Sequence, residues 1–394
     1  MKIKNFTNVF KREIKRIFTH RDLLLICFAA PMVYGLLFSF LYINKRAGNI
    51  NIGVVDFDNS AISRELIRAV NASPELNPSG GYASPNEAYA DILKDKIDAL
   101  YFIPQGFSED IKKGKPAVAV GAVNAGNFLV SSAVLKKVSA ISMEFSKQEF
   151  IKILMRRGFD YKSADNLFHP LRADNRYIFN PEMNYSAFFL PALLIAVLQQ
   201  ILLIAVCSSV SKEKIDGGQK ELYEAAGGSW TAVFLGKSLP YVFVGIALNL
   251  AGIFIMLPHN GIYASSVLNL TLVSTAFIMA ITAFAILISA LFNSPQASLA
   301  ALMFYAMPTL LLSGFAWPNY ALPIYLQIIS LFFPSTYAVN HIRILILGDA
   351  ALKYSILPIA VLLSFALLCY FAARLVERKT RRIFAILPKK SNLK

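Results

Sequence analysis

Six long apolar runs constrain this sequence of 394 residues more than any other feature. A helix rises about 1.5 Å per residue, so about 20 apolar residues can cross the roughly 30 Å hydrocarbon core of a bilayer. The runs that meet this length are Leu23–Ile43, Ala187–Val210, Ala232–Leu257, Val267–Phe292, Ala297–Ala316 and Tyr354–Ala373. Only 16% of the residues are charged, against about 25% in soluble proteins. The sequence therefore predicts an α-helical polytopic membrane protein with six transmembrane helices.

The excess positive charge is concentrated at the two ends of the chain. Residues 1–21 carry seven Lys or Arg against Glu13, and residues 374–394 carry eight against Glu377. The long polar segment 44–185 is nearly balanced, with 18 basic and 16 acidic residues. Basic residues beside membrane spans mark the cytoplasmic side. We therefore expect a multi-pass protein of the bacterial inner membrane with both termini in the cytoplasm and segment 44–185 outside, and we expect no binding to nucleic acid.

This topology divides the chain into five regions. We expect a cytoplasmic amphipathic helix over 1–21, the first transmembrane helix over 22–43 and a periplasmic domain over 44–185. Residues 186–376 then hold five transmembrane helices, with a cytoplasmic loop at 211–230 and an outer segment at 317–353, and a basic cytoplasmic tail occupies 377–394. The apolar stretches Leu322–Phe333 and Ala338–Leu347 are too short to span, so they predict re-entrant or interfacial helices.

Segment 44–185 alternates between strand and helix signals. Asn51–Phe57 is a short apolar run, and Ser60 then offers an N-cap before residues at helical spacing. The further expected elements are helices over Glu87–Lys96 and Phe107–Lys113, strands over Ala99–Ile103 and Ala117–Val123, and a long helix from Phe128 to about Arg157. These patterns predict a small α/β domain on a helical stalk.

The predicted spans carry little ionisable chemistry. Asp22 and Lys237 lie at cytoplasmic edges, where their side chains are expected to reach the interface. Ion-coupled transporters usually need an ionisable group within the membrane, so the energy for any transport is expected from outside this chain. Gln199 and Gln200 are expected either to join helices by hydrogen bonds or to contact a substrate. No catalytic constellation or metal-ligand spacing is evident in the sequence, and we expect no bound cofactor or metal.

The N-terminal region predicts a helix that lies in the membrane interface. Aromatic and aliphatic side chains fall near one face of this helix, and basic side chains fall largely opposite. The apolar set includes Phe6, Phe10 and Ile14, and the basic set includes Lys11, Arg12 and Lys15.

Three stretches resemble one family of membrane proteins. The polar segment contains VVDFDNSAIS at 54–63, IPQGF at 103–107 and GKPA at 114–117. The predicted inner loop contains KEKIDGGQKEL at 212–222, followed by LGKSLPY at 235–241. The last stretch is SGFAWP at 313–318, followed by Pro323, Pro334 and Gly348. Together they resemble the permeases of type-2 ABC exporters, in the branch with a large extracytoplasmic domain between the first and second spans.

The resemblance implies a function and partners. Such a permease pairs with an identical or sister permease, and a separate ABC ATPase binds ATP and Mg²⁺, so this chain would not be an enzyme. The loop 211–230 would couple the ATPase to the spans through Glu213, Gly217, Gly218, Glu221, Leu222 and Tyr223. The N-terminal helix would serve as a membrane anchor alone or also contact the ATPase. The family usually has Thr and Pro where this loop has Gly218 and Ala226.

The resemblance also places an outer gate at Ser313, Gly314, Phe315, Trp317 and Pro318. Aromatic residues around this gate would suit an amphipathic or hydrophobic substrate, drug-like or lipid-like, but they are equally typical of an interfacial aromatic belt. Segment 44–185 is expected to dock a periplasmic adaptor or to guide the substrate. The alternative is a membrane scaffold, secretion accessory or receptor of the same topology that transports nothing.

Overall fold

The computed structural model describes residues 2–41, 49–126, 128–168, 185–292, 294–315, 317–348 and 350–386. They form two compact units, a helical unit of 2–41 with 185–386 and an α/β unit of 49–168. The junctions predicted around segment 44–185 fall largely in 42–48 and 169–184, and the end of the predicted basic tail falls in 387–394, all outside the described residues. The domain boundaries therefore stay predictions.

Among the described residues, six spans are long and apolar enough to cross a membrane. The first comprises α2 (Arg21–Leu24), the π-helical turn η1 (Leu25–Ala29) and α3 (Ala30–Leu41), and the second is α9 (Tyr185–Ile215). The third comprises α11 (Trp230–Ala251), the π-helical turn η2 (Gly252–Met256) and α12 (Leu257–His259). The last three are α13 (Val267–Leu291), α14 (Pro295–Leu312) and α17 (Ile356–Ile386). The predicted fold class, six spans with a small α/β domain, is confirmed.

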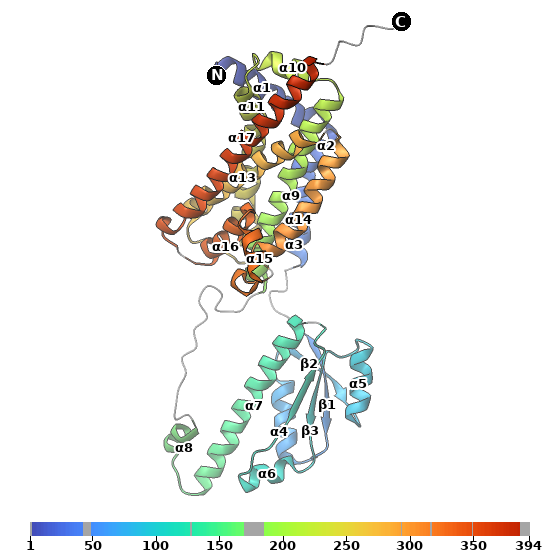
Figure 1. The fold of residues 1–394 in the computed structure, drawn as a ribbon. Coiled ribbons are helices and arrows are strands. Elements are labelled where there is room, and N and C mark those ends of the chain that lie inside the picture. Colours follow the sequence, from blue (N-terminus) through green and yellow to red (C-terminus); the bar gives the residue numbers. More distant parts are fainter. Residues whose placement is uncertain are drawn as a thin grey trace. The chain divides into compact units, whose positions relative to one another are not determined.

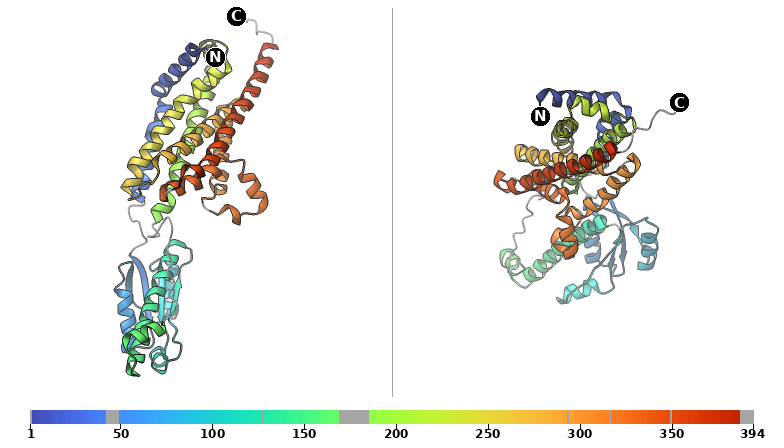
Figure 2. Two further views of the ribbon diagram at one scale, coloured as in Figure 1. Left: turned by 90° about the vertical axis from the view of Figure 1, so that its left-hand side faces the viewer. Right: turned by 45° about the horizontal axis from the view of Figure 1, so that its top comes forward.

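The fourth span lies at the centre of the helical unit. Helix α13 packs against α9, α11, α16 and α17, and its residues Val273, Phe277 and Ile281 are completely buried. The first span lies at the edge and is the least buried of the six. Figure 2 shows the same arrangement from two further directions.

Short helices gather at the two ends of this bundle (Figure 1). One end carries α1 (Ile3–Thr19), α10 (Gln219–Ala225) and the last turns of α17. The other carries η3 (Asn319–Ala321), α15 (Ile324–Ser330), α16 (Pro334–Leu347) and η4 (Leu352–Tyr354). Helix α16 is largely buried against α9 and α13, whereas α15 exposes most of its apolar side chains. Whether this segment enters the membrane stays a prediction.

The α/β unit is a four-stranded sheet in the order β2-β1-β3-β4. Its strands are β1 (Ile50–Asp56), β2 (Leu76–Gly81), β3 (Ala99–Ile103) and β4 (Val120–Val123), with β4 antiparallel to β3 and the other pairs parallel. The helices α4 (Ala61–Asn71), α6 (Phe107–Lys113) and α7 (Phe128–Arg156) pack on one face, and α5 (Pro85–Leu93) packs on the other. Helix α8 (Tyr161–Phe168) follows α7 and contacts it.

Alternation along the strands explains these layers, because successive side chains point to opposite faces of a sheet. Tyr101 of β3 is buried on the α4 and α7 face, and its neighbour Leu100 is buried on the α5 face. Ser60 caps α4 by accepting a hydrogen bond from the backbone N–H of Ser63 at 3.0 Å. Strand β2 and helix α8 had no counterpart among the elements expected from the sequence.

Candidate functional site

Helix α10 is the short helix in the predicted coupling loop. Helix α9 ends at Ile215, and Gly217 then adopts a φ of 70°, a left-handed conformation that glycine accepts without steric cost. This turn sets α10 beside α1 and α11. Gly218 follows, and a Cβ there would lie 3.3 Å from Nη2 of Arg12. Gly218, where the family usually has Thr, thus leaves room for the Arg12 side chain.

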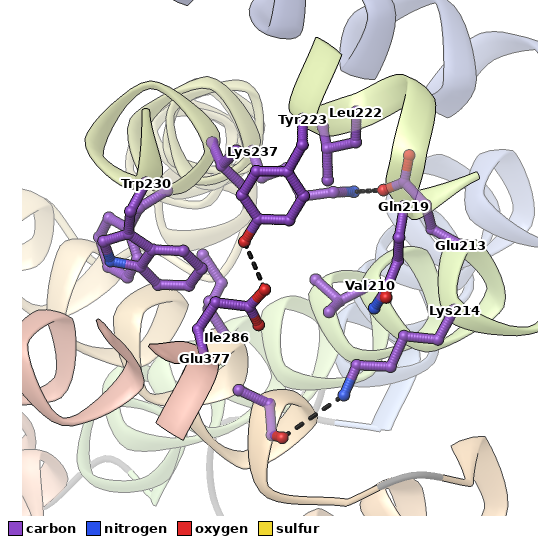
Figure 3. Close-up of a pocket in the computed structure, with 13 residues that line it drawn as sticks. Val210, Glu213, Lys214, Gln219, Leu222, Tyr223, Trp230, Lys237, Ile286 and Glu377 are labelled. Atoms are coloured by element: carbon purple, nitrogen blue, oxygen red, sulfur yellow. Dashed lines mark hydrogen bonds and ion pairs between the residues drawn. The ribbon is translucent and has the colours of Figure 1, made fainter. Parts of the chain in front are cut away.

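The buried side of α10 joins it to three other helices. Leu222 is buried in a small apolar cluster with Val9 of α1 and Val233 of α11. The hydroxyl of Tyr223 donates a hydrogen bond of 2.6 Å to Oε1 of Glu377 on α17. Figure 3 shows Tyr223 pointing toward Glu377 across a small cavity. This cavity has a volume of only about 40 Å³, so the region is a packed junction rather than a ligand pocket.

The opposite side of α10 carries charges in solvent. The side chains of Lys220, Glu221 and Glu224 are 88%, 77% and 66% exposed. Glu221 lies 3.5 Å from Nη2 of Arg12, and Lys220 lies 3.9 Å from Glu224. A helix that is fixed on one face and charged on the other suits docking of a partner protein.

A group of ionisable side chains lies beneath α10, between α1, α9 and α11. We call Glu13, Arg16, Glu213 and Lys237 the buried charge cluster. Nζ of Lys237 lies 2.8 Å from Oε2 of Glu13 and 2.6 Å from Oε2 of Glu213. Arg16 lies 3.3 Å from Oε1 of Glu213, and Arg12 also pairs with this oxygen from the rim. Figure 3 shows Lys237 directed at Glu213.

Glu13 is held ionised by its neighbours. The hydroxyl of Tyr241 donates to its Oε1 at 2.9 Å, and the hydroxyl of Ser209 donates to the same atom. Burial by itself would raise the pKa of Glu13, but the charge of Lys237 and these hydrogen bonds outweigh it and hold the pKa below its ordinary value. The cluster therefore ties α1 to α9 and α11 by charge as well as by packing.

The cluster corrects the expectation for Lys237 and shows where Glu213 lies. Lys237 does not reach the interface: it is 4% exposed and shared between two carboxylates. The prediction that it extends to the interface is wrong, because Glu13 supplies a countercharge inside the protein. Glu213 is 1% exposed, and its carboxylate pairs with Arg12 of α1 and Lys237 of α11. Its predicted part in coupling stays a prediction, and its carboxylate lies inside the bundle rather than on the surface.

Helix α1 buries a different face from the one that its aromatic residues suggest. Val9, Glu13 and Ile17 point into the bundle. Phe6 and Phe10 are half-buried, and Phe10 packs edge-on against Phe243. Ile14, Lys11 and Lys15 are exposed and Arg12 is half-buried. An apolar stripe that also includes exposed Phe18 therefore remains available to lipid, and the predicted membrane anchor stays a prediction.

The predicted gate residues gather at the other end of the bundle. Ser313, Gly314 and Phe315 are buried, and the carbonyl of Ser313 accepts a hydrogen bond of 3.2 Å from Nδ2 of Asn340 on α16. Gly314 has a φ of 81°, and a Cβ there would lie 2.2 Å from the same amide nitrogen. Trp317 and Pro318 are exposed.

Gln199 and Gln200 lie away from this gate, near the middle of α9. Gln199 is buried and Gln200 is half-buried. Neither side chain makes a hydrogen bond within the part of the chain that the structure describes. Among the described residues, the structure therefore shows no hydrogen bond from either glutamine to the gate residues or to another helix.

The residues that sequence reasoning missed are Glu13, Lys237 and Tyr241. A signal was present, since Glu13 is the single acid among seven basic residues at the N-terminus. Pairing it with the one lysine of the third span would have predicted the contact between α1 and α11.

Comparison with known proteins defines the family. A family described as ABC-2 family transporter protein matches residues 21–375. The chain belongs to this family. The ABC-2 permease is similar to the probable multidrug ABC transporter permeases YbhS and YbhR of Escherichia coli K12. YbhS is 23% identical over 348 residues, or 86% of this chain and 87% of the relative, and YbhR is 22% identical over 352 residues, or 87% and 90%.

A further relative is ABC transporter G family member 20 of Dictyostelium discoideum. It is 25% identical over 379 residues, which are 92% of the ABC-2 permease and 49% of the relative. Permeases of the family work in general with an ABC ATPase and as dimers. The family match begins at residue 21, so it includes Glu213 and Lys237 of the buried charge cluster but not Glu13 or Arg16 of α1.

Proposed function

We propose that this ABC-2 permease is the membrane half of an ATP-driven exporter, with ATP hydrolysed on a separate ATPase subunit. The observation that carries the proposal is the arrangement of α10, which is fixed on one face and charged on the other. Its buried side is joined to α1, α11 and α17, and its exposed side presents Lys220, Glu221 and Glu224. An ATPase that closes around this helix would move a part already bonded to the spans.

Two routes lead from α10 into the bundle, and a third starts at the adjoining end of α9. Leu222 transmits displacement to α1 through Val9, and Tyr223 transmits it to the sixth span through Glu377. Glu213, at the end of the second span, carries it to the third span through Lys237. Packed side chains and ion pairs with discrete arrangements can transmit a movement of this kind.

The end of the bundle that carries α10 is proposed to face the cytoplasm. It also holds α1 and the end of α17 (Figure 1), the two regions where the excess basic residues lie. By the positive-inside rule, the α/β unit would then lie outside the cytoplasm. There it would dock a periplasmic adaptor or guide the substrate, and a second permease, identical or a sister chain, would complete the membrane channel.

The substrate is proposed to be a hydrophobic or amphipathic compound. The E. coli relatives are named probable multidrug permeases, and the spans of this chain are overwhelmingly apolar. A drug-like or lipid-like molecule that dissolves in the bilayer would enter such a protein without leaving an apolar environment.

The test is to express the permease together with the genes that neighbour its own, and to measure whether an ATPase subunit co-purifies and hydrolyses ATP. Glu221→Lys reverses one charge of the exposed α10 surface and should remove the ATPase subunit or its vanadate-sensitive activity. Glu109→Lys is the matched control, because its side chain is 65% exposed on α6 of the α/β unit. A permease that purifies alone and inert, or a Glu221→Lys complex with wild-type activity, would reject the proposal and favour a membrane scaffold.

A further inference from the structure

A large groove lies between the first three spans, away from α10 and from the predicted gate. Its walls come from the first span, from α9 and from the α11 to η2 region of the third span. Its volume is about 940 Å³, near the upper end of the roughly 300–1,000 Å³ typical of small-molecule sites. No Asp, Glu, Lys or Arg is among its lining residues. The groove therefore suits an uncharged, largely apolar molecule.

Two breaks in helical regularity border the groove. The turn η1 lies in the first span and contributes Phe28, and η2 lies in the third and contributes Phe254 and Ile255. Single π-helical turns are rare and occur frequently at functional sites. Gly35 also lines the groove, and a Cβ built on it would have no atom within 4 Å. Gly35 therefore faces open space, and a larger side chain at this position would project into the groove.

Asn249 is the most deeply buried of the polar residues that line the groove, which also include Tyr34, Ser39 and His259. It is 2% exposed, lines the groove, and makes no side-chain hydrogen bond among the described residues. The amide of Asn249 faces the groove without a protein partner among the described residues, so a bound molecule with a hydrogen-bonding group would supply that partner.

The depth of Asn249 restricts the occupant. It lies ten residues before His259 at the end of the third span, or about 15 Å along the helix axis. A span of 30 residues is about 45 Å long, well over the roughly 30 Å hydrocarbon core. Asn249 therefore lies within the hydrocarbon core, below the level where phospholipid ester groups lie.

We propose that this groove binds the transported compound, an uncharged hydrophobic molecule with a carbonyl or hydroxyl that bonds to the amide of Asn249. The proposal rests on the export function proposed above and adds the place and chemistry of substrate recognition. It differs from the outer gate and from Gln199 and Gln200, the residues that the sequence suggested for the substrate path.

The experiment is photolabelling of the full-length permease in lipid nanodiscs with benzophenone. This probe is apolar, has one carbonyl, and on illumination couples preferentially to nearby methionine. Met32 and Met256 line the groove, while Met303 and Met307 lie on α14 outside it. Met32 and Met307 are 68% and 65% exposed, so benzophenone dissolved in lipid would label them equally. We expect saturable labelling of Met32 and Met256 at least five times that of Met303 and Met307.

Two variants and a control test the assignment. Gly35→Leu fills the groove and should reduce labelling of Met32 and Met256 at least tenfold. Asn249→Leu keeps the volume but removes the amide, and the loss of one hydrogen bond of about 1 kcal/mol should reduce labelling about fivefold. Val33→Leu lies two residues from Gly35, is exposed and does not line the groove, so it should label like the wild type.

Equal labelling of all four methionines in the wild type would overturn the proposal. So would equal labelling of Met32 and Met256 in all three variants. So would a co-purified phospholipid that protects Met32 and Met256, or protection that disappears when a dimer dissociates, because the occupant would then be a lipid or a second copy of the chain. Labelling requires no ATPase, so its failure is distinguishable from failure of the Glu221→Lys test. Should Asn249→Leu fail to fold, Gly35→Leu retains the test.

Discussion

Lys237 lies between the carboxylates of Glu13 and Glu213, which are far apart in the sequence. Its Nζ is within 3 Å of both Glu13 and Glu213. Ion pairs at this depth are costly to break from one side only, because a charge is left buried without its partner. The stability of the junction therefore depends on all members of the cluster together.

The first prediction concerns Lys237. Lys237→Met should lower the free energy of unfolding by about 3–5 kcal/mol, because Glu13 and Glu213 would share a buried site with less positive charge. The measurement is the unfolding midpoint in mild detergent. Adding Glu13→Gln should restore most of the loss, because Arg16 and Glu213 then remain as a neutral pair. Lys220→Met, at an exposed lysine of α10, should change little, and a single Lys237→Met variant as stable as the wild type would contradict the cluster.

The second prediction concerns pH. The pKa of Glu13 is lowered in the folded state from its ordinary value of 4.5, so its ionised form contributes stability above pH 4.5. That contribution is lost as the pH falls through the lower folded pKa. Wild-type stability should therefore drop more steeply below pH 4.5 than that of Glu13→Gln. Thermal midpoints of both proteins between pH 6 and pH 3.5, in steps of about half a unit across this transition, measure the difference, and parallel curves would refute it.

At the scale of elements, α1 lies against α11 because Gly236 has no side chain. A Cβ at Gly236 would lie 2.6 Å from both Cβ and Cγ1 of Val9, closer than carbon atoms can approach. This contact brings Glu13 within reach of Lys237 and places Val9 beside Leu222 of α10. One glycine in the third span thus determines how the N-terminal helix joins the coupling loop.

The third prediction compares two glycines inside helices. Gly236→Ala should cost about 1–3 kcal/mol by overpacking and should loosen α1. Relative to the wild type, amide hydrogen exchange should accelerate more over Ile3–Thr19 than over the rest of the chain. Gly35→Ala is the control, since nothing lies within 4 Å of its Cβ position and alanine is the better helix former by about 1 kcal/mol. Unchanged exchange in α1 of the Gly236→Ala variant would show that the contact is not required.

At the scale of the whole molecule, two compact units share one chain. The α/β unit has its own buried clusters on both faces of its sheet, and the helical unit has a core centred on α13. The charge bias of the termini predicts that the exposed face of α10 lies in the cytoplasm and that the sheet lies outside.

The fourth prediction tests that sidedness. A membrane-impermeant maleimide should label Lys112→Cys of α6 in intact cells, and Lys220→Cys of α10 only after permeabilisation. Both positions are exposed. The native Cys27, Cys207 and Cys369 are buried, so the unmodified chain should give little background. The reverse labelling pattern would invert the proposed topology.

Much of the architecture could be predicted from the sequence, because it depends on properties that add up along the chain. Apolar length defines a span, and each predicted run overlaps an observed one. Capping at Ser60 and apolar runs such as Ala99–Ile103 located the main elements of the α/β unit. Strand β2 was missed because Pro78, Gly80 and Gly81 disfavour strands, and it forms only because β1 offers a parallel partner.

The site was only partly predictable for a physical reason. The loop at 211–230, its short helix and the exposed Glu221 lie close together in sequence, and local pattern was sufficient to locate them. The buried state of Glu213 and Lys237 depends on Glu13, which is 200 or more residues away in the chain, and on the missing side chain of Gly236. The groove beside Asn249 likewise needs three spans packed together. Hydropathy and charge along the chain determined what this protein is made of, and only the tertiary packing decided which charges are paired and where apolar surface is left open.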